Sequence, residues 1–293
     1  MKYSEKYNCS FTGEQIEKIL SGINAGKAAL NDRDALMRCY AAMDLTTLKS
    51  QDTEDSVRAF VRKINEFSEA HPEYPAPASV CVFSNFASVV SKEAKPEGMH
   101  TTVVSACFPT SQSFLEVKLL ECALAVRSGA DEVDIVLALN SFLCEETRQK
   151  AFDEIVAVRQ TVDREAAVCG RKVILKVILE TGLLKTPELI AEASFLAMEA
   201  GADFIKTSTG KVEVNATPQA AAVMCGCIAA YYAATGRKVG FKAAGGISAA
   251  GEALLYYSIV RDILGDEWTG NDLFRLGVSR LWDSLVNAIG NCR

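Results

Sequence analysis

Four segments of the chain place charged side chains among residues typical of buried β-strands. They are Glu-Val-Asp-Ile-Val around Asp134, Leu-Lys-Val-Ile-Leu around Lys176, Phe-Ile-Lys-Thr-Ser around Lys206 and Gly-Phe-Lys-Ala-Ala around Lys242. Side chains alternate between the two faces of a strand. Because the immediate neighbours are apolar or small and suit packing against helices, we expect the four charges to point the other way and converge.

The chemistry that such a cluster could perform is the capture of a carbonyl compound by a lysine amine. The alternative is a buried structural ion-pair network. Three lysines that share one or two carboxylates do not balance in charge, so at least one lysine should be disfavoured as a cation. Neighbouring ammonium groups and burial both lower the pKa of a lysine. Imine formation requires a neutral amine, so the pattern favours chemistry over a purely structural role.

The segments that must position these charges alternate between strand and helix patterns. Strands are predicted over residues 39–44, 79–83, 101–107, 132–138, 173–179, 203–208, 239–244 and 273–278, and helices over 53–70, 85–95, 113–128, 145–168, 187–200, 218–235, 248–264 and 280–289. This alternation predicts an α/β protein, a single (β/α)₈ TIM barrel over residues 36–293. The competing doubly wound sheet would usually carry a glycine-rich turn after its first strand. This chain has Asp44-Leu-Thr-Thr there instead.

Residues 1–35 hold one further helix candidate, over residues 14–29, which we expect to cap the bottom of the barrel as an N-terminal extension. The net charge of −6 argues against a general nucleic-acid binder. No apolar run has the length of a membrane span. The ten cysteines form no Cys-x-x-Cys pair, and the polar N-terminus has no secretory signal. We therefore expect reduced thiols in a cytoplasmic protein.

Small and hydroxyl residues follow the charged strands. The resulting loops are Thr207-Ser-Thr-Gly-Lys211, Ala243-Ala-Gly-Gly246 and Gly277-Val-Ser-Arg280. Loops after the last strands of such barrels commonly bind phosphate through backbone N–H groups, so three of them at one end predict a phosphate-bearing substrate. A zinc-dependent site is disfavoured, because His71 and His100 are the two histidines of the chain. His100 also opens the third predicted strand, at the end opposite the active face.

Longer motifs surround these charges: Gly129-Ala-Asp-Glu-Val-Asp-Ile-Val136, Leu175-Lys-Val-Ile-Leu-Glu-Thr-Gly182, Lys206-Thr-Ser-Thr-Gly-Lys211 and Gly240-Phe-Lys-Ala-Ala-Gly-Gly246. From about residue 37 to residue 289 the chain resembles the deoxyribose-phosphate aldolase family. The resemblance implies a class I, Schiff-base aldolase that needs no cofactor or metal. It would reversibly cleave a small phosphorylated sugar, 2-deoxy-D-ribose 5-phosphate, to acetaldehyde and D-glyceraldehyde 3-phosphate. It also implies a homodimer.

The resemblance further implies roles for individual residues. Lys206 would form the imine, Lys242 would depress the pKa of Lys206 and take part in proton transfer, and Asp134 would be the acid–base carboxylate, acting through a water. Lys176 would support Asp134. Cys81 would be either a small buried residue or a thiol near the cavity mouth. The substrate cavity would be lined by Asp44 and Thr46, and contacts to substrate hydroxyls and phosphate would come from Thr209, Gly210, Lys211, Gly245, Gly246, Gly277 and Ser279.

Two departures from the family pattern lie in the phosphate loops. Ser248 stands where many relatives have arginine, and Arg280 stands where a second serine is common. We hypothesise that Arg280 restores the lost positive charge. Two other functions stay open: a Schiff-base lyase with a different carbonyl donor, and a barrel that has lost turnover and serves as a binding protein. The presence of Asp134, Lys206 and Lys242 weighs against the second.

Overall fold

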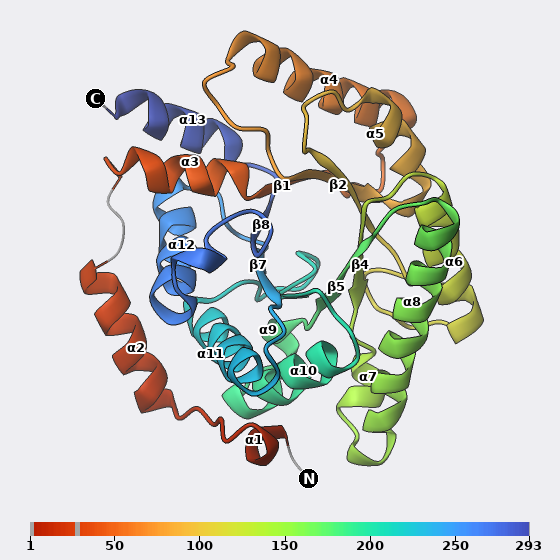
Figure 1. The fold of residues 1–293 in the computed structure, drawn as a ribbon, viewed down its shortest axis with the longest axis vertical. Helices are drawn as coiled ribbons and strands as arrows, with labels where there is room; N and C mark the ends of the chain where they lie inside the picture. The colour runs from red at the N-terminus through yellow and green to blue at the C-terminus, as the bar shows by residue number, and fades with distance from the viewer. Residues whose placement is uncertain (1–2, 27–29, 293) are drawn as a thin grey trace.

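A computed structural model, which describes residues 3–26 and 30–292, has eight parallel strands closed into one barrel (Figure 1). Each strand pairs with its neighbours in sequence, and β8 closes on β1. The strands are β1 (Met43–Thr46), β2 (Ser79–Phe83), β3 (His100–Val104), β4 (Glu132–Val136), β5 (Ile174–Ile178), β6 (Phe204–Lys206), β7 (Gly240–Ala244) and β8 (Phe274–Val278). The predicted (β/α)₈ barrel is confirmed.

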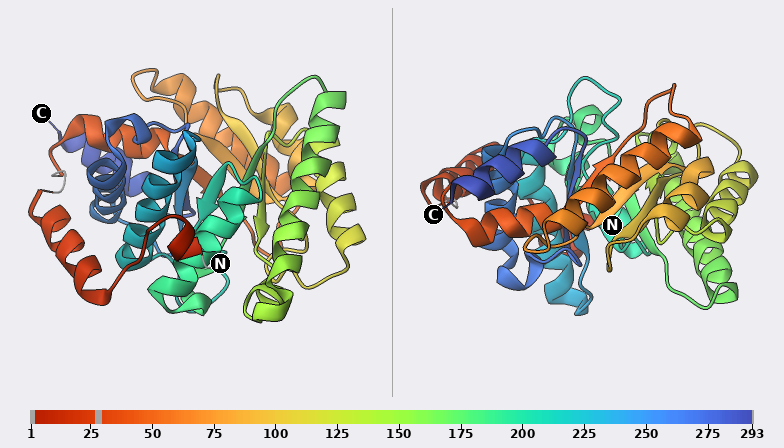
Figure 2. Two further views of the ribbon diagram at one scale, coloured as in Figure 1. Left: turned by 60° about the horizontal axis from the view of Figure 1, so that its bottom comes forward. Right: turned by 90° about the horizontal axis from the view of Figure 1, so that it is seen from above.

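Helices follow the strands and surround the barrel (Figure 2). The longer ones are α4 (Glu54–Ala70), α5 (Ala87–Glu93), α6 (Leu115–Arg127), α8 (Arg148–Val168), α10 (Pro187–Glu199), α11 (Pro218–Thr235), α12 (Ala250–Leu264) and α13 (Trp282–Asn291). Shorter helices are α1 (Tyr3–Lys6), α7 (Leu139–Phe142) and α9 (Thr181–Leu184). Thr186 and Thr217 are the N-caps of α10 and α11, which both begin with a proline. Each threonine hydroxyl accepts a hydrogen bond from the backbone N–H three residues further along the chain. No helix of the described residues is long and apolar enough to cross a membrane.

The first strand begins later than its sequence pattern predicts. Residues 39–41, predicted as strand, end helix α3 (Arg33–Ala41), and β1 starts at Met43. Leu36, Cys39 and Tyr40 are buried on one face of this helix, and Asp32 caps its N-terminus by accepting from the Ala35 N–H. A short apolar run does not by itself distinguish a strand from the last turn of a buried helix.

The N-terminal extension lies outside the helix ring rather than over the barrel bottom, where we expected it. Helix α2 (Gly13–Gly26) contacts α11 and α12 (Figure 1) and buries Ile16, Leu20 and Ile23. Helix α11 is rich in alanine and other apolar residues around its whole circumference, so its outer face also needs cover. The last predicted residues of the extension helix, 27–29, lie outside the described part of the chain.

Candidate active site

A cavity of about 420 Å³ opens at the carboxyl ends of β1, β6, β7 and β8 and between the loops that follow them. It lies where the active sites of such barrels are built. Its lining includes ten of the residues selected from the sequence: Thr46, Lys206, Thr209, Gly210, Lys211, Gly245, Gly246, Gly277, Ser279 and Arg280. It also includes residues that sequence reasoning did not select, among them Lys49 and Asn215. Residues far apart in the chain thus share one polar cavity.

Lys206 connects this cavity to the interior of the barrel. Its side chain ends β6, is 4% exposed, and donates to Oδ2 of Asp134 at 2.8 Å. Lys242, which pairs with Lys206 in the register of β6 and β7, donates to the same oxygen at 2.8 Å. Two lysine nitrogens therefore share one carboxylate oxygen directly below the cavity.

Six charged side chains fill the barrel below Lys206, and we call them the buried charge network: Asp44, Glu132, Asp134, Lys176, Lys242 and Arg275. Lys176 contacts Glu132 and also Asp134, at 3.0 Å. Arg275 bridges Asp44 and Glu132, each at 2.7 Å. Lys242 contacts Asp44 at 2.5 Å. All six residues are at most 2% exposed, so each charge depends on its partners.

The charges within this network cancel. Three carboxylates, on Asp44, Glu132 and Asp134, face three cations, on Lys176, Lys242 and Arg275. A positive charge on Lys206 would therefore be in excess, in a site where burial penalises it. The sequence prediction counted three lysines against one or two carboxylates and missed Glu132 and Arg275. With both included, four cations face three carboxylates, so one cation is still in excess. Strand alternation could have found both, because they lie two residues from Asp134 and Gly277.

The pKa directions follow this charge balance. Burial lowers the pKa of Lys206 below its ordinary value and the Lys242 ammonium adds to the effect, while Asp134 opposes it. Burial would also lower the pKa of Lys242, but Asp134 and Asp44 outweigh burial and raise it. Burial would raise the pKa of Asp134, but Lys176, Lys206 and Lys242 together hold it well below its usual range. The arrangement thus favours a neutral amine at Lys206 beside an ammonium and a carboxylate.

The loop after β6 is held by Glu180, a residue that sequence reasoning quoted in a motif but did not select. Glu180 is 2% exposed and has a left-handed backbone, with φ of 56°. Its carboxylate accepts from the Thr209 hydroxyl at 2.5 Å and from the Thr209 backbone N–H at 3.1 Å. The Lys211 ammonium in turn donates to the Leu48 carbonyl oxygen at 2.6 Å. These contacts fix the loop against its neighbours.

Glycine lets the loop after β7 approach the loop after β6. Gly245 has φ of +87°, and a Cβ atom there would lie 2.7 Å from the side chain of Asn215. Gly277 has a similar role under the cavity, since its Cβ would lie 2.9 Å from Cβ of Ala244 and 3.1 Å from Cε of Lys242. Side chains at these two positions would push the loops or the lysine out of place.

Comparisons with known proteins agree with this geometry. Residues 38–264 match the family described as DeoC/LacD family aldolase. A Caenorhabditis elegans protein named "Putative deoxyribose-phosphate aldolase" is 38% identical over 281 residues, which cover 95% of this chain and 89% of that protein. The chain belongs to the DeoC/LacD aldolase family. Family membership makes it an aldolase, a carbon–carbon lyase.

Solved structures share the barrel. A crystal structure of a provisionally named deoxyribose-phosphate aldolase from Toxoplasma gondii ME49 superposes with a TM-score of 0.74 at 20% identity, covering 89% of this chain and 96% of that one. The structure titled "QR15, an Aldolase" is 27% identical, with a TM-score of 0.65, and covers 87% of this chain and 98% of that one. At 20% identity the first likeness shows the fold alone.

Asp44, expected in the cavity wall, and Cys81, expected either at the cavity mouth or as a small buried residue, do not line the cavity of this aldolase. Lys176, expected to support Asp134, contacts it at 3.0 Å and does not line the cavity either. Asp44 and Lys176 are fully buried members of the charge network. Cys81 is 1% exposed and packs with Leu48 and Val104, and burial raises the pKa of its thiol. The geometry of Cys81 thus agrees with the alternative of a small buried residue. In the described part of the chain, no three His, Cys, Asp or Glu side chains are grouped to hold a metal ion.

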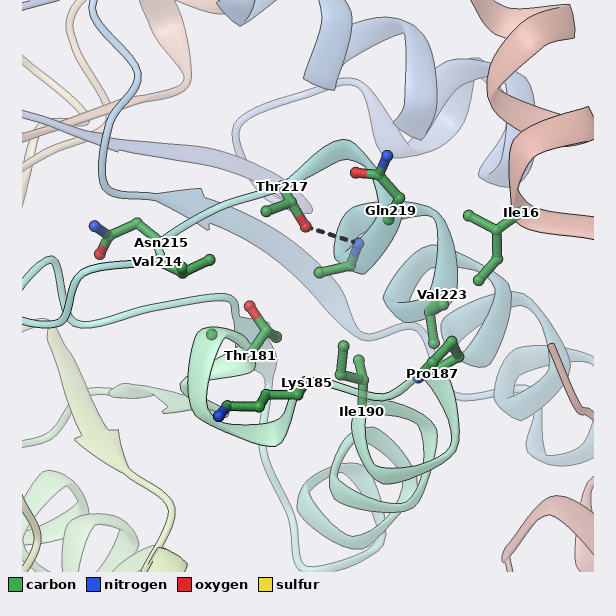
Figure 3. Close-up of a pocket in the computed structure, with 12 residues that line it drawn as sticks. Ile16, Thr181, Lys185, Pro187, Ile190, Val214, Asn215, Thr217, Gln219 and Val223 are labelled. Atoms are coloured by element: carbon green, nitrogen blue, oxygen red, sulfur yellow. Dashed lines mark hydrogen bonds between the residues drawn. The ribbon is translucent and has the colours of Figure 1, made fainter. Parts of the chain in front are cut away.

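A second cavity of about 380 Å³ is lined in part by Val214, Asn215 and Thr217 of the loop after β6 (Figure 3). Asn215 lines both cavities, and the side chains of Val214, Ile190 and Val223 make this one largely apolar. Of the described residues that line it, Lys185 is the one that carries a charge. Lys206 lines the first cavity, and Asp134 and Lys242, which do not line it, are buried behind Lys206 and joined to it through one carboxylate oxygen. We therefore assign the active site to the first cavity.

Proposed function

We propose that this aldolase cleaves 2-deoxy-D-ribose 5-phosphate, reversibly and without a cofactor, into acetaldehyde and D-glyceraldehyde 3-phosphate through an imine on Lys206. The observation that carries the proposal is the position of Lys206: it reaches the cavity, and its positive charge would be in excess over a balanced network. The name of the C. elegans relative supports the choice of substrate. In this proposal the enzyme acts in the cytoplasm as a homodimer.

The reaction begins when the neutral amine of Lys206 attacks C1 of the open-chain aldehyde. Loss of water leaves a protonated imine, which accepts electrons. A base then removes the proton of the C3 hydroxyl, the C2–C3 bond breaks, and its electron pair moves toward the imine to form an enamine. D-Glyceraldehyde 3-phosphate leaves as the aldehyde. Protonation of the enamine at C2 and hydrolysis of the imine by water release acetaldehyde and restore the amine.

Asp134 and Lys242 are the groups proposed to carry protons. One oxygen of Asp134 accepts from both lysine nitrogens at 2.8 Å, so the Lys242 ammonium, a proton donor, is held beside the amine of Lys206. The pKa of Asp134 is held low by the surrounding ammonium groups, which keeps it a carboxylate that orients both lysines. We propose that a water held by this pair exchanges protons with the substrate.

The phosphate of the substrate is proposed to bind at the opposite side of the cavity from Lys206. Gly246, Ser279 and Arg280 line the cavity, and in this proposal the first two would offer backbone N–H groups and the third its guanidinium. The N–H of Gly245 donates instead to the Gly277 carbonyl oxygen at 3.4 Å. Lys49, from the loop after β1, adds a second exposed cation to the lining. Phosphate binding remote from the broken bond would position the sugar and lower the barrier.

The test is a comparison of carbonyl donors in the direction of synthesis. With D-glyceraldehyde 3-phosphate as the acceptor, we expect acetaldehyde to give 2-deoxyribose 5-phosphate, identified by mass and by its cleavage back to the same products. Dihydroxyacetone and pyruvate should give less than one hundredth of that rate. A preference for either of these would assign another Schiff-base reaction. No product from any donor would support the binding-protein function instead.

A further inference from the structure

The buried charge network reaches the opposite end of the barrel from the cavity. His100 is the first residue of β3, at the amino end of the strands, and its side chain is 41% exposed. Its Nδ1 atom lies 2.7 Å from Oε1 of Glu132. Glu132 is fully buried and also accepts from the Thr102 hydroxyl at 2.8 Å. A titratable group that solvent reaches thus contacts the network directly.

A continuous series of contacts leads from His100 to Lys206. Glu132 contacts the ammonium of Lys176, and the same ammonium donates to Oδ1 of Asp134 at 3.0 Å. Oδ2 of Asp134 accepts from Lys206 at 2.8 Å. From Glu132 onward each link joins charged groups that are almost completely buried, where screening by water is weak. A change of charge at His100 should therefore be felt at the amine.

We propose that His100 is a positioning residue for the amine of Lys206: protonation of its imidazole adds a positive charge to the network and so favours the neutral amine in the cavity. The inference rests on the proposed function, in which Lys206 forms the imine. The network is neutral without Lys206, so a charged His100 makes a Lys206 ammonium the second excess cation.

The surroundings of His100 make it responsive near neutral pH. Its hydrogen bond to Glu132, on β4, raises the pKa of the imidazole most strongly, and Asp131, just before β4, raises it further. Burial and Arg275, on β8, act in the opposite direction. The net result is a pKa above the ordinary value for histidine, so the imidazole keeps its charge to a higher pH than an isolated histidine would.

The size of the effect follows from the distance. Val104, which pairs with Asp134, lies four residues after His100 on β3, so the backbone span from His100 to the level of Asp134 is on the order of 13 Å at about 3.3 Å per residue. A unit charge at that distance, partly screened at the exposed imidazole, should change the population of neutral amine by about threefold.

The experiment compares pH profiles of kcat/KM for 2-deoxyribose 5-phosphate cleavage in three variants. His100→Gln keeps a hydrogen-bonding side chain but is never charged, whereas His100→Lys is always charged. His71→Gln is the control, because His71 lies outside the barrel and pairs with Glu73. Thermal unfolding of each variant accompanies the kinetics.

We expect His100→Gln to lose about threefold in kcat/KM at pH 6, and the loss to become smaller as the pH rises and His100 of the wild type loses its charge. The acidic limb of the His100→Gln pH profile should therefore lie at higher pH than that of the wild type. His100→Lys should match the wild type at pH 6 and exceed it slightly at pH 9. His71→Gln should follow the wild-type profile throughout.

Superimposable profiles for folded His100→Gln, His100→Lys and wild type would overturn the inference while leaving the proposed function intact. Absence of cleavage in the wild type would instead remove the proposed function. If His100→Gln does not fold, the coupling between His100 and Lys206 is tested by the pH profile of His100→Lys and by an NMR titration of His100. By reciprocity, His100 should have a lower pKa in Lys206→Arg, where residue 206 is always charged, than in Lys206→Met, where it never is. Equal titrations of His100 in these two variants would contradict the coupling.

Discussion

The amino end and the cavity end of the barrel interior contain the same types of charged residue but differ in how completely these charges are paired. At the amino end, Glu132 is held by His100, Thr102, Lys176 and Arg275, so that every charge has a partner. At the cavity end, Lys206 has Asp134 as its ion-pair partner and shares that carboxylate with Lys176 and Lys242. Complete pairing leaves no charge in excess at the amino end, whereas incomplete pairing leaves one amine able to lose its proton.

The comparison shows how a structural ion network can prepare a catalytic group. The network supplies a fixed set of opposed charges, and its balance decides which member can be neutral. Lys242 is as buried as Lys206 but contacts two carboxylates, and its pKa is raised rather than lowered. Substitutions at the cavity end should therefore have their largest effects on activity, and substitutions at the amino end should have their largest effects on stability.

The largest effect on activity besides loss of Lys206 itself is expected for Lys242→Met. This change removes the ammonium that disfavours the charge on Lys206 and the proposed proton carrier. We expect kcat to fall by about 10² to 10⁴, and imine formation at Lys206 to require higher pH, because the pKa of Lys206 rises. The control is Lys238→Met, an exposed lysine just before β7. Equal kcat values for the two variants would contradict the comparison.

The largest effect on stability is expected for Glu132→Gln. Removal of this carboxylate leaves the buried cations Arg275 and Lys176 with too little negative charge around them. We therefore expect the free energy of unfolding, measured with urea at pH 7, to fall by about 3–5 kcal/mol. Glu267→Gln, which breaks the exposed pair with Lys238, is the matched control and should leave the midpoint unchanged.

The pH dependence of Glu132→Gln sharpens this expectation. In the folded protein the pKa of Glu132 lies well below its usual range. Its contribution is therefore present above the unfolded pKa and is lost as pH falls through the folded one. The stability difference between wild type and Glu132→Gln should shrink on acidification. A constant difference between pH 7 and pH 3 would show that the charge of Glu132 is not what stabilises the amino end.

A smaller effect is expected for Arg280→Ala, at the rim of the cavity. If Arg280 binds the phosphate, KM for 2-deoxyribose 5-phosphate should rise about tenfold or more, with KM for unphosphorylated 2-deoxyribose almost unchanged. Arg62→Ala, an exposed arginine on α4, serves as the control. Equal changes in KM for both sugars would assign the phosphate to the backbone N–H groups of the glycine loops alone.

Sequence reasoning predicted the barrel well because strand and helix periodicities repeat eight times, and each repeat supports the others. It failed where local and tertiary signals overlap. The apolar pair Cys39 and Tyr40 fits the end of a buried helix as well as the start of a strand. Helix α2 covers α11 because α11 is apolar around its whole circumference. No local sequence pattern predicts the helical end of α3 or the packing of α2 against α11.

The candidate site could be predicted in its lysines and only in part in its carboxylates. Lys206 and Lys242 stand out because cations are rare inside strands. Asp44 was assigned to the cavity wall, but its side chain points down to Arg275 and Lys242. Whether an inward residue lies in the cavity or below it depends on the stagger of the strands, which sequence spacing within one strand does not contain.

The most direct test of the central claim is borohydride trapping with acetaldehyde, read by intact mass and peptide mapping in the wild type, in Lys206→Met and in Lys238→Met. We expect a reduced two-carbon adduct on Lys206 in the wild type and in Lys238→Met, and none in Lys206→Met. An adduct on Lys242, or no adduct in the folded wild-type protein, would contradict the assignment of Lys206 as the imine-forming amine.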